Sequence, residues 1–186
     1  MIEHSLALDF SDHESLVIGI LSDTHGELNS NVANFIKDCD IALHAGDIMG
    51  AHCLKALKPK LGVTISVKGN NDAASTWAEE DHPLLDSIPD QVELNLPGGT
   101  LIMEHSHRMW NSDFNKIHDS LREYYPDAQL VVYGHTHVRV IDESAKPMIL
   151  NPGAAGLIRN HGGPSCVKLT ANAKKWEITE HLFETD

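Results

Sequence analysis

Carboxylate and imidazole side chains recur at short spacings, and each time they follow an apolar run. Five runs end in this way: 16–21 before Asp23 and His25, 41–45 before Gly46 and Asp47, 63–68 before Gly69 to Asp72, 100–103 before Glu104 to His107, and 130–133 before Gly134 to His137. Imidazole and carboxylate together suit Mn, Fe, Zn, Ni or Co. A cage made only of oxygen ligands, as Ca or Mg prefers, is not what these residues offer. The pattern therefore indicates a metal site.

Buried strands are the elements that would bring these clusters together. An unbroken aliphatic run such as 16–21 is typical of a strand covered on both faces, and open α/β sheets bind ligands beyond the carboxyl ends of such strands. If the chain is still extended at Asp23 and His25, positions i and i+2 project to the same side. One carboxylate oxygen and one ring nitrogen could then reach a common point. We expect the five clusters to meet at one edge of the fold.

Composition is that of an ordinary globular protein. The 186 residues, 41% hydrophobic and 22% charged, suit a single domain over 16–186 that follows an N-terminal extension, 1–15. We expect no membrane span and no secretion signal, and therefore a cytoplasmic protein. The net charge of −13 and the lack of a basic cluster argue against a nucleic-acid groove. The three widely spaced cysteines Cys39, Cys53 and Cys166 are expected to be buried thiols.

Periodicity predicts an α/β fold. Strands at 16–21, 41–45 and 63–68 alternate with helices over 28–38 and 51–57, which makes a parallel core of the first seventy residues. After it come a hairpin and then more strands, at 91–96, 100–103, 130–133, 138–143, 148–151, 165–170 and 175–183. This order favours a two-sheet β-sandwich flanked by helices. Residues 1–15 are expected to be a loose extension or a short edge strand.

Two other segments have predictable roles. The polar, proline-bounded connection 73–89 is long enough to fold over the strand ends as a substrate lid, although a plain surface loop is the favoured interpretation. Ser112 is expected to cap a helix over 113–125. One face of this helix is apolar and should pack on the core; it carries Phe114, Ile117, Leu121 and Tyr124.

The five clusters, in this order, resemble the motifs of the calcineurin-like metallophosphoesterase superfamily over residues 16 to about 156. The short chain, the Tyr133 to His137 motif and the later Asn151-Pro152-Gly153 look most like the small YfcE-like phosphodiesterase branch. The resemblance implies a two-sheet sandwich with helices outside and two divalent metal ions. Manganese is the expected metal, with Fe, Zn, Ni, Co or Mg as alternatives. The implied activity is hydrolysis of a small phosphorylated substrate, by in-line attack of a hydroxide that bridges the two metals.

The resemblance also implies a role for each matching residue. It assigns Asp23, His25 and His137 to one metal, and Asn70, His105 and His135 to the other, with Asp47 bridging the two. The implied catalytic residues are Asn70, Asn71, Asp72 and His107. Asp72 is expected to orient Asn71 or a metal ligand through hydrogen bonds.

One position departs from the family pattern. Many relatives have a histidine, thought to protonate the leaving group, where this chain has Asn71. An amide cannot act as a general acid, so strongly basic leaving groups should react poorly. His107 could supply a proton or contact phosphate, and a mere packing role beside the ligands is an equal alternative.

Other polar residues are given structural roles. His44 is expected to belong to the buried strand, Thr24 and Thr136 to point away from the metals, and Asn151 to shape a turn. Arg108 and Arg159 are candidate phosphate contacts by charge alone, and a solvated surface role is favoured for both.

Two other functions compete with a phosphodiesterase. The first is a protein-binding scaffold on the same fold, as in the retromer subunit of this superfamily. The second is a phosphomonoesterase, and Asn71 favours diesters over monoesters. A homo-oligomer is compatible with all three functions.

Overall fold

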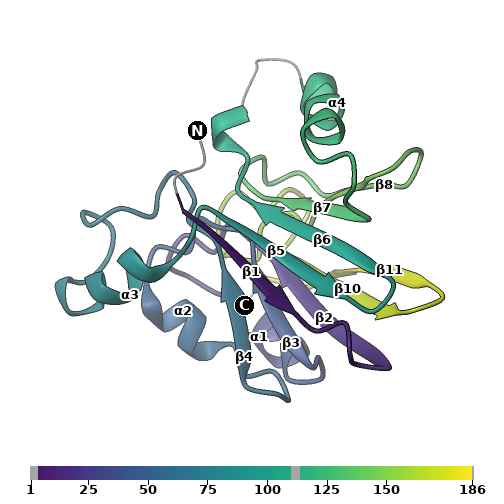
Figure 1. Ribbon diagram of the computed structural model, residues 1–186. Coiled ribbons are helices and arrows are strands. Elements are labelled where there is room, and N and C mark those ends of the chain that lie inside the picture. Colours follow the sequence, from purple (N-terminus) through teal and green to yellow (C-terminus); the bar gives the residue numbers. More distant parts are fainter. Residues whose placement is uncertain (1–3, 110–113, 186) are drawn as a thin grey trace.

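Two β-sheets lie face to face, and helices cover their outer faces (Figure 1). The computed structural model describes residues 4–109 and 114–185. The first sheet has the order β1-β5-β6-β7-β9-β8, with bounds Ser5–Asp9, Gln91–Leu96, Gly99–Glu104, Leu130–Tyr133, Met148–Asn151 and Val140–Asp142. The second has the order β11-β10-β2-β3-β4, with bounds Trp176–Leu182, Ser165–Asn172, Ser15–Leu21, Ile41–His44 and Val63–Ser66. The predicted helix-flanked sandwich is confirmed.

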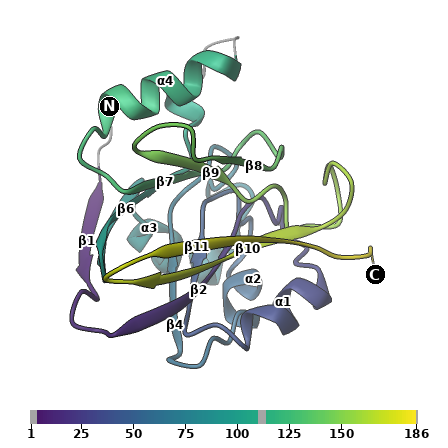
Figure 2. The ribbon, with the colours of Figure 1, turned by 90° about the vertical axis from the view of Figure 1, so that its right-hand side faces the viewer.

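Helices lie on both outer faces, as Figure 2 shows: α4 covers the first sheet, and α1 and α2 lie below the second. The bounds of the helices are Ser30–Ile36 for α1, Ala51–Ala56 for α2, His82–Ser87 for α3 and Phe114–Tyr124 for α4. Short 3-10 turns cover Glu79–Asp81 and His107–Met109. The side chain of Asn29 caps α1 by accepting the backbone N–H groups of Asn31 and Val32. No helix in the described ranges is long and apolar enough to cross a membrane.

Alternation along the strands builds the core between the sheets. In β5, Val92, Leu94 and Leu96 are buried, while the residues between them are partly exposed. The parallel pairs β2/β3 and β3/β4 confirm the predicted core of the first seventy residues. Because strand β3 is buried along its whole length, it shows no alternation in its sequence. The three cysteines are free and buried, as expected.

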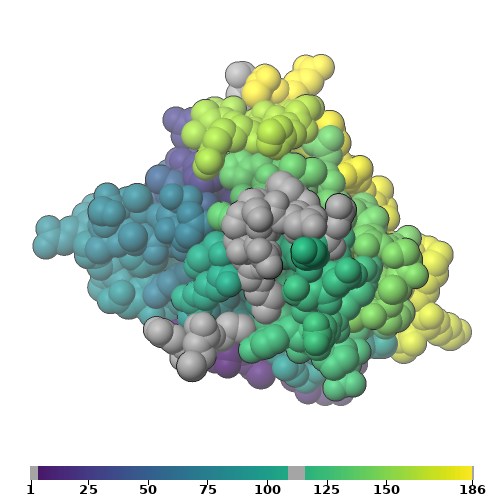
Figure 3. Space-filling view, turned by 90° about the horizontal axis from the view of Figure 1, so that it is seen from above, coloured from purple at the N-terminus to yellow at the C-terminus, as the bar shows by residue number. Residues whose placement is uncertain are grey.

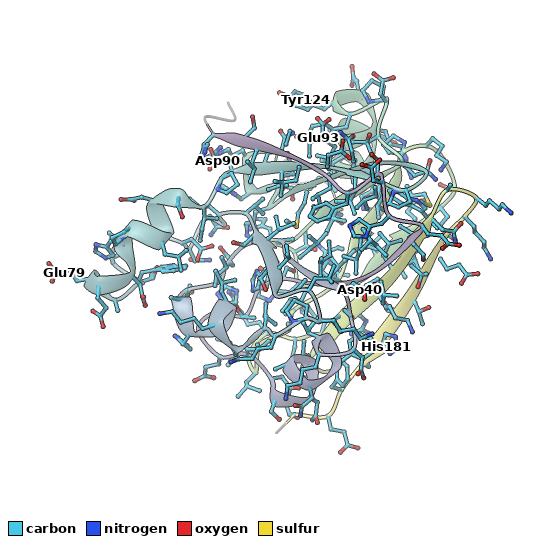
Figure 4. The ribbon with its side chains drawn as sticks, turned by 60° about the horizontal axis from the view of Figure 1, so that its bottom comes forward. Asp40, Glu79, Asp90, Glu93, Tyr124 and His181 are labelled. Carbon is cyan, nitrogen blue, oxygen red and sulfur yellow. The ribbon has the colours of Figure 1, made fainter. Side chains whose placement is uncertain are left out.

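The predicted apolar stripe of α4 is partly wrong. Ile117 and Leu121 are buried against the first sheet, but Tyr124 is 60% exposed and Tyr125 is buried in its place. Figure 4 shows Tyr124 pointing out from the end of the helix. The helix ends at Tyr124, so the chain turns there and the next residue enters the core. The predicted cap Ser112 and the side chain of Phe114 lie outside the described residues.

The sequence left two interpretations open for residues 1–15 and for the connection 73–89. Ser5–Asp9 is an edge strand that pairs in parallel with β5, so the edge-strand interpretation is confirmed for these residues. The connection 73–89 packs through Trp77, Leu85 and Ile88 on α2 and projects sideways, with Glu79 near its tip (Figure 4). The favoured interpretation as a plain loop is only partly right, because the segment contains a 3-10 turn and helix α3 and shares a small hydrophobic cluster with α2.

Candidate metal centre

The loops that carry the predicted ligands are sharply turned rather than extended. Asp23, His25, Asp47, His135 and His137 all have a positive φ, between 47° and 71°. This left-handed conformation costs roughly 1 kcal/mol or more for each non-glycine residue, and such strain gathers at functional sites. Three backbone hydrogen bonds join the loop after β2 to the loop after β3, from the N–H groups of residues 23, 25 and 26 to the carbonyls of residues 46, 47 and 48. The side chains therefore converge through paired turns, not through an extended strand end.

Asp23, His25 and His137 form the first group of candidate ligands. One ligand atom from each lies within 4.8 Å of the others. The Nε2 atoms of His25 and His137 are 3.1 Å apart, and Asp23 Oδ1 lies 3.3 Å from His137 Nε2 and 3.8 Å from His25 Nε2. Asp23 is completely buried, and Ser22 Oγ holds its other carboxylate oxygen at 2.6 Å.

Asp47, His105 and His135 form the second group, again with ligand atoms within 4.8 Å of one another. Asp47 Oδ1 lies 3.3 Å from His105 Nε2, while Asp47 Oδ2 lies 3.8 Å from His25 Nε2 in the first group. The His105 and His135 rings meet edge to face, with centroids 5.3 Å apart. Asp47 therefore lies between the two groups and presents one oxygen to each.

Hydrogen bonds outside the groups fix which ring nitrogens face inward. His105 Nδ1 lies 2.7 Å from the carbonyl of Ala45, and His137 Nδ1 lies 3.0 Å from the carbonyl of Arg159. A carbonyl only accepts, so both Nδ1 atoms carry hydrogen, and in its neutral form each ring directs an Nε2 lone pair at a carboxylate. His25 Nδ1 similarly faces the sulfur of Met49 at 3.3 Å. Outer partners of this kind orient histidines that bind metals.

The inward atoms suit a cation. Asp23 Oδ1 and His105 Nε2 are buried and have no hydrogen-bond partner among the described residues. Burial acts to raise the pKa of Asp23 and of Asp47, but the neighbouring imidazoles outweigh it and hold both pKa values below their usual range. The two carboxylates conversely hold the pKa of His105 above its usual range, although its burial opposes them. Lone pairs and carboxylates that face one another this closely need a proton or a metal ion between them.

Glycines leave room for the groups. A Cβ atom on Gly69 would lie 2.1 Å from Asp47 Oδ1, and one on Gly134 would lie 2.6 Å from the Ala45 carbonyl and 2.8 Å from His105 Nδ1. Neither loop could carry a side chain at these positions without displacing a candidate ligand.

The two asparagines after β4 occupy different environments. Asn71 donates its backbone N–H to Asp47 Oδ1 at 2.8 Å and its side-chain amide to Asp47 Oδ2 at 2.6 Å. Asn70, the predicted ligand, has an exposed side chain. The structure therefore brings six of the seven predicted ligands together and places Asn71, rather than Asn70, against the shared carboxylate.

Asp72 fastens the loops behind the site. Its carboxylate accepts the backbone N–H groups of Ile48, Met49 and Gly69 and the indole N–H of Trp77, at 2.8–3.0 Å. Ile48 and Met49 directly follow Asp47. The sequence predicted that Asp72 orients Asn71 or a metal ligand through hydrogen bonds, and in the structure Asp72 holds the backbone of the two residues that follow Asp47.

His107 lies beside the second group. Its ring centroid is 5.6 Å from that of His105 and 6.3 Å from that of His135. Burial, followed by the nearby charge of His105, lowers the pKa of His107 to about 4. The ring is therefore neutral at pH 7 in the metal-free protein.

The polar residues with structural roles lie as expected. His44 is buried and faces the hydroxyl of Thr24, which itself donates to the carbonyl of Ile48. Asn151 donates to the carbonyl of Gly134 and to the hydroxyl of Thr136, at 2.8 and 3.0 Å. These contacts support the loops around the groups.

Sequence reasoning missed several residues that contact the groups. Ser22 was adjacent to a candidate ligand and could have been noticed for that reason. No local pattern pointed to Met49. Arg159 was not missed, since its charge made it a candidate phosphate contact, and its guanidinium Nη2 lies 2.8 Å from His25 Nε2. Arg108 instead pairs with Asp90, whose Oδ2 lies 2.8 Å from its Nη1.

Comparisons with known proteins agree with this geometry. Residues 16–174 match the family model of the calcineurin-like phosphoesterase superfamily domain. A phosphodiesterase of Methanocaldococcus jannaschii is 28% identical over an alignment of 147 residues, which covers 73% of this chain and 82% of that protein.

Solved structures share the fold at lower identity. A predicted phosphoesterase from Streptococcus pneumoniae superposes with a TM-score of 0.63 at 20% identity, and the match covers 94% of each chain. Vacuolar protein sorting 29 from Cryptosporidium parvum superposes with a TM-score of 0.69 at 18% identity, covering 92% of this chain and all of that one. Since the family model spans most of the sequence, the chain belongs to the calcineurin-like phosphoesterase superfamily.

Proposed function

We propose that this protein is a phosphodiesterase that works with two divalent metal ions. The observation that carries the proposal is the pair of ligand groups that share Asp47, with lone pairs of His105 and His137 directed at carboxylates. A fold that served only as a scaffold would have no physical need for this arrangement. The phosphodiesterase of M. jannaschii among the relatives supports the same activity.

Each ligand group would hold one ion. Asp23, His25 and His137 would bind the first, and His105 and His135, with an amide oxygen from the 70–71 turn, would bind the second. Asp47 would serve both ions. Asn70 is the proposed amide ligand, and Asn71 holds the Asp47 carboxylate from the side. Manganese suits this mixture of imidazole and carboxylate, as do Fe, Zn, Ni and Co.

The reaction is hydrolysis of one P–O ester bond. Two ions bound here would lower the pKa of a water molecule and neutralise charge on the phosphate oxygens. The water oxygen forms a bond to phosphorus, the opposite P–O bond breaks, and the leaving alkoxide ends as an alcohol. Asn71 cannot donate the proton that this alkoxide needs, and His107 is neutral in the metal-free protein. Diesters with acidic leaving groups, such as a nitrophenyl diester, should therefore react best.

The test compares wild type with Asp47→Asn after loading with Mn. Wild type should bind two ions per chain and hydrolyse bis(p-nitrophenyl) phosphate, while Asp47→Asn should lose the two-metal stoichiometry and nearly all activity. Asp86→Asn, the same substitution at an exposed position of α3, should change neither. A wild-type protein that binds no metal by elemental analysis and leaves the diester intact would overturn the proposal.

A protein-binding scaffold is the second candidate, because vacuolar protein sorting 29 shares the fold. The same experiment separates the two functions, since a scaffold does not require metal-dependent turnover. A phosphomonoesterase would instead hydrolyse p-nitrophenyl phosphate faster than the diester.

A further inference from the structure

We propose that Arg159 binds the phosphate group of the substrate, which makes it the anion-recognition residue of the proposed phosphodiesterase site. The inference rests on the proposed function and adds a residue that the ligand groups do not include. It starts from the guanidinium position: Nη2 lies 2.8 Å from His25 Nε2 and 3.4 Å from His25 Nδ1. A fixed positive charge therefore lies against a histidine of the first ligand group.

The other arginines of the chain are used differently. Arg108 pairs with Asp90, Arg122 with Asp142 and Arg139 with Glu180. Among the residues that the structure describes, Arg159 has no such carboxylate partner, and its guanidinium lies against an imidazole instead. A guanidinium has five donors in a planar fork that matches phosphate oxygens. The contact with a ring nitrogen leaves most of these donors available for an anion.

The backbone holds Arg159 in this place. Its carbonyl accepts a hydrogen bond from His137 Nδ1 at 3.0 Å, so its main chain and its side chain contact two different histidines of one group. Arg159 has a φ of 53°, and Asn160 ties the loop back by donating to the Gly156 carbonyl at 2.7 Å. This segment, yellow-green in Figure 3, lies on the surface of that face of the molecule, where a substrate can approach.

The contact with His25 is one that metal binding must replace. Arg159 can only donate, so His25 Nε2 accepts with the lone pair that the first ion would use. A guanidinium displaced from this nitrogen would remain beside the first ligand group, tethered by its anchored backbone. That is where an anionic phosphate needs a donor.

Two affinities, measured by titration calorimetry, test the proposal in opposite directions. In Arg159→Gln, the Mn-loaded protein should bind inorganic phosphate about tenfold more weakly, the low end for a hydrogen bond to a charged group. The metal-free variant should bind Mn at least as tightly as wild type, because a competing cation has been removed from His25. For the diester, KM should rise by a similar factor while kcat changes little, since the contact exists before and during the reaction. Arg159→Lys keeps the positive charge but not the planar set of donors, so its phosphate affinity should lie between those of wild type and Arg159→Gln.

Arg139→Gln is the matched control. Arg139 supports the same loop by donating to the His161 carbonyl at 2.9 Å, but it does not contact His25. The Arg139→Gln substitution should leave the phosphate affinity unchanged. Unchanged phosphate binding in Arg159→Gln, or a parallel loss of phosphate and Mn affinity, would show that Arg159 only supports the loop and would overturn the proposal. If wild type itself bound no Mn or cleaved no diester, the proposed function would fail instead, so the two failures are distinguishable.

Discussion

Asp72 is expected to stabilise the protein and to position Asp47 without touching a metal. In Asp72→Asn, the oxygen that accepts from Ile48, Met49 and Trp77 can be kept, but an NH₂ group then faces the N–H of Gly69. The buried hydrogen bond from Gly69 to a charged acceptor is lost, and the new NH₂ group and the N–H of Gly69, both donors, face each other. A bond of this kind contributes about 1.5–3 kcal/mol. Because Asp72 is only 8% exposed, solvent should not replace it.

The measurement is thermal unfolding of the metal-free protein. A loss of about 2–3 kcal/mol corresponds to a Tm lower by roughly 5–10 °C for a domain of this size. Asp86→Asn, at an exposed position, should stay within about 0.5 kcal/mol of wild type. Mn affinity should fall as well, because the loop that carries Asp47 loosens. If both variants melted at the same temperature, the hydrogen bond from Gly69 to the charged Asp72 carboxylate would contribute no net stability, and the reasoning would be refuted.

Two other predictions concern helix α4. Leu121→Ala should lower the free energy of unfolding, measured with urea, by about 2–5 kcal/mol, because the side chain is fully buried. Tyr124→Ala at the exposed end should lower it by under about 0.5 kcal/mol. Equal losses would contradict the assignment of the buried face of α4. Burial lowers the pKa of His118 below its usual 6.5, so the unfolded chain gains a proton there that the folded chain resists. The contribution of His118 to stability should therefore be fully present above about pH 6.5 and decrease as the pH falls below it, and His118→Gln should lose less stability over that range. A variant with the same pH profile as wild type would show that His118 does not contribute.

Local patterns predicted the elements well. The all-apolar runs at 16–21 and 41–45 became buried parallel strands, since a chain covered on both faces has no polar side to show. The hairpin of β5 and β6 followed from alternation and from the turn at Pro97 to Gly99. The end of α4 was less predictable. Whether Tyr124 or Tyr125 enters the core depends on the residue at which the helix stops, and periodicity does not determine that residue.

The sequence by itself determined the types and the order of the candidate ligands and the family, because these depend only on which residues follow each strand. The tertiary structure alone decided which nitrogen of each histidine faces inward, since the carbonyls of Ala45 and Arg159 come from other loops. It also placed Asn71 on Asp47, spread the contacts of Asp72 over two loops and brought Arg159 to His25. The contacts of Asn71 with Asp47, of Asp72 with Met49 and of Arg159 with His25 join residues 23 to 134 positions apart, and no short-range pattern encodes such pairings.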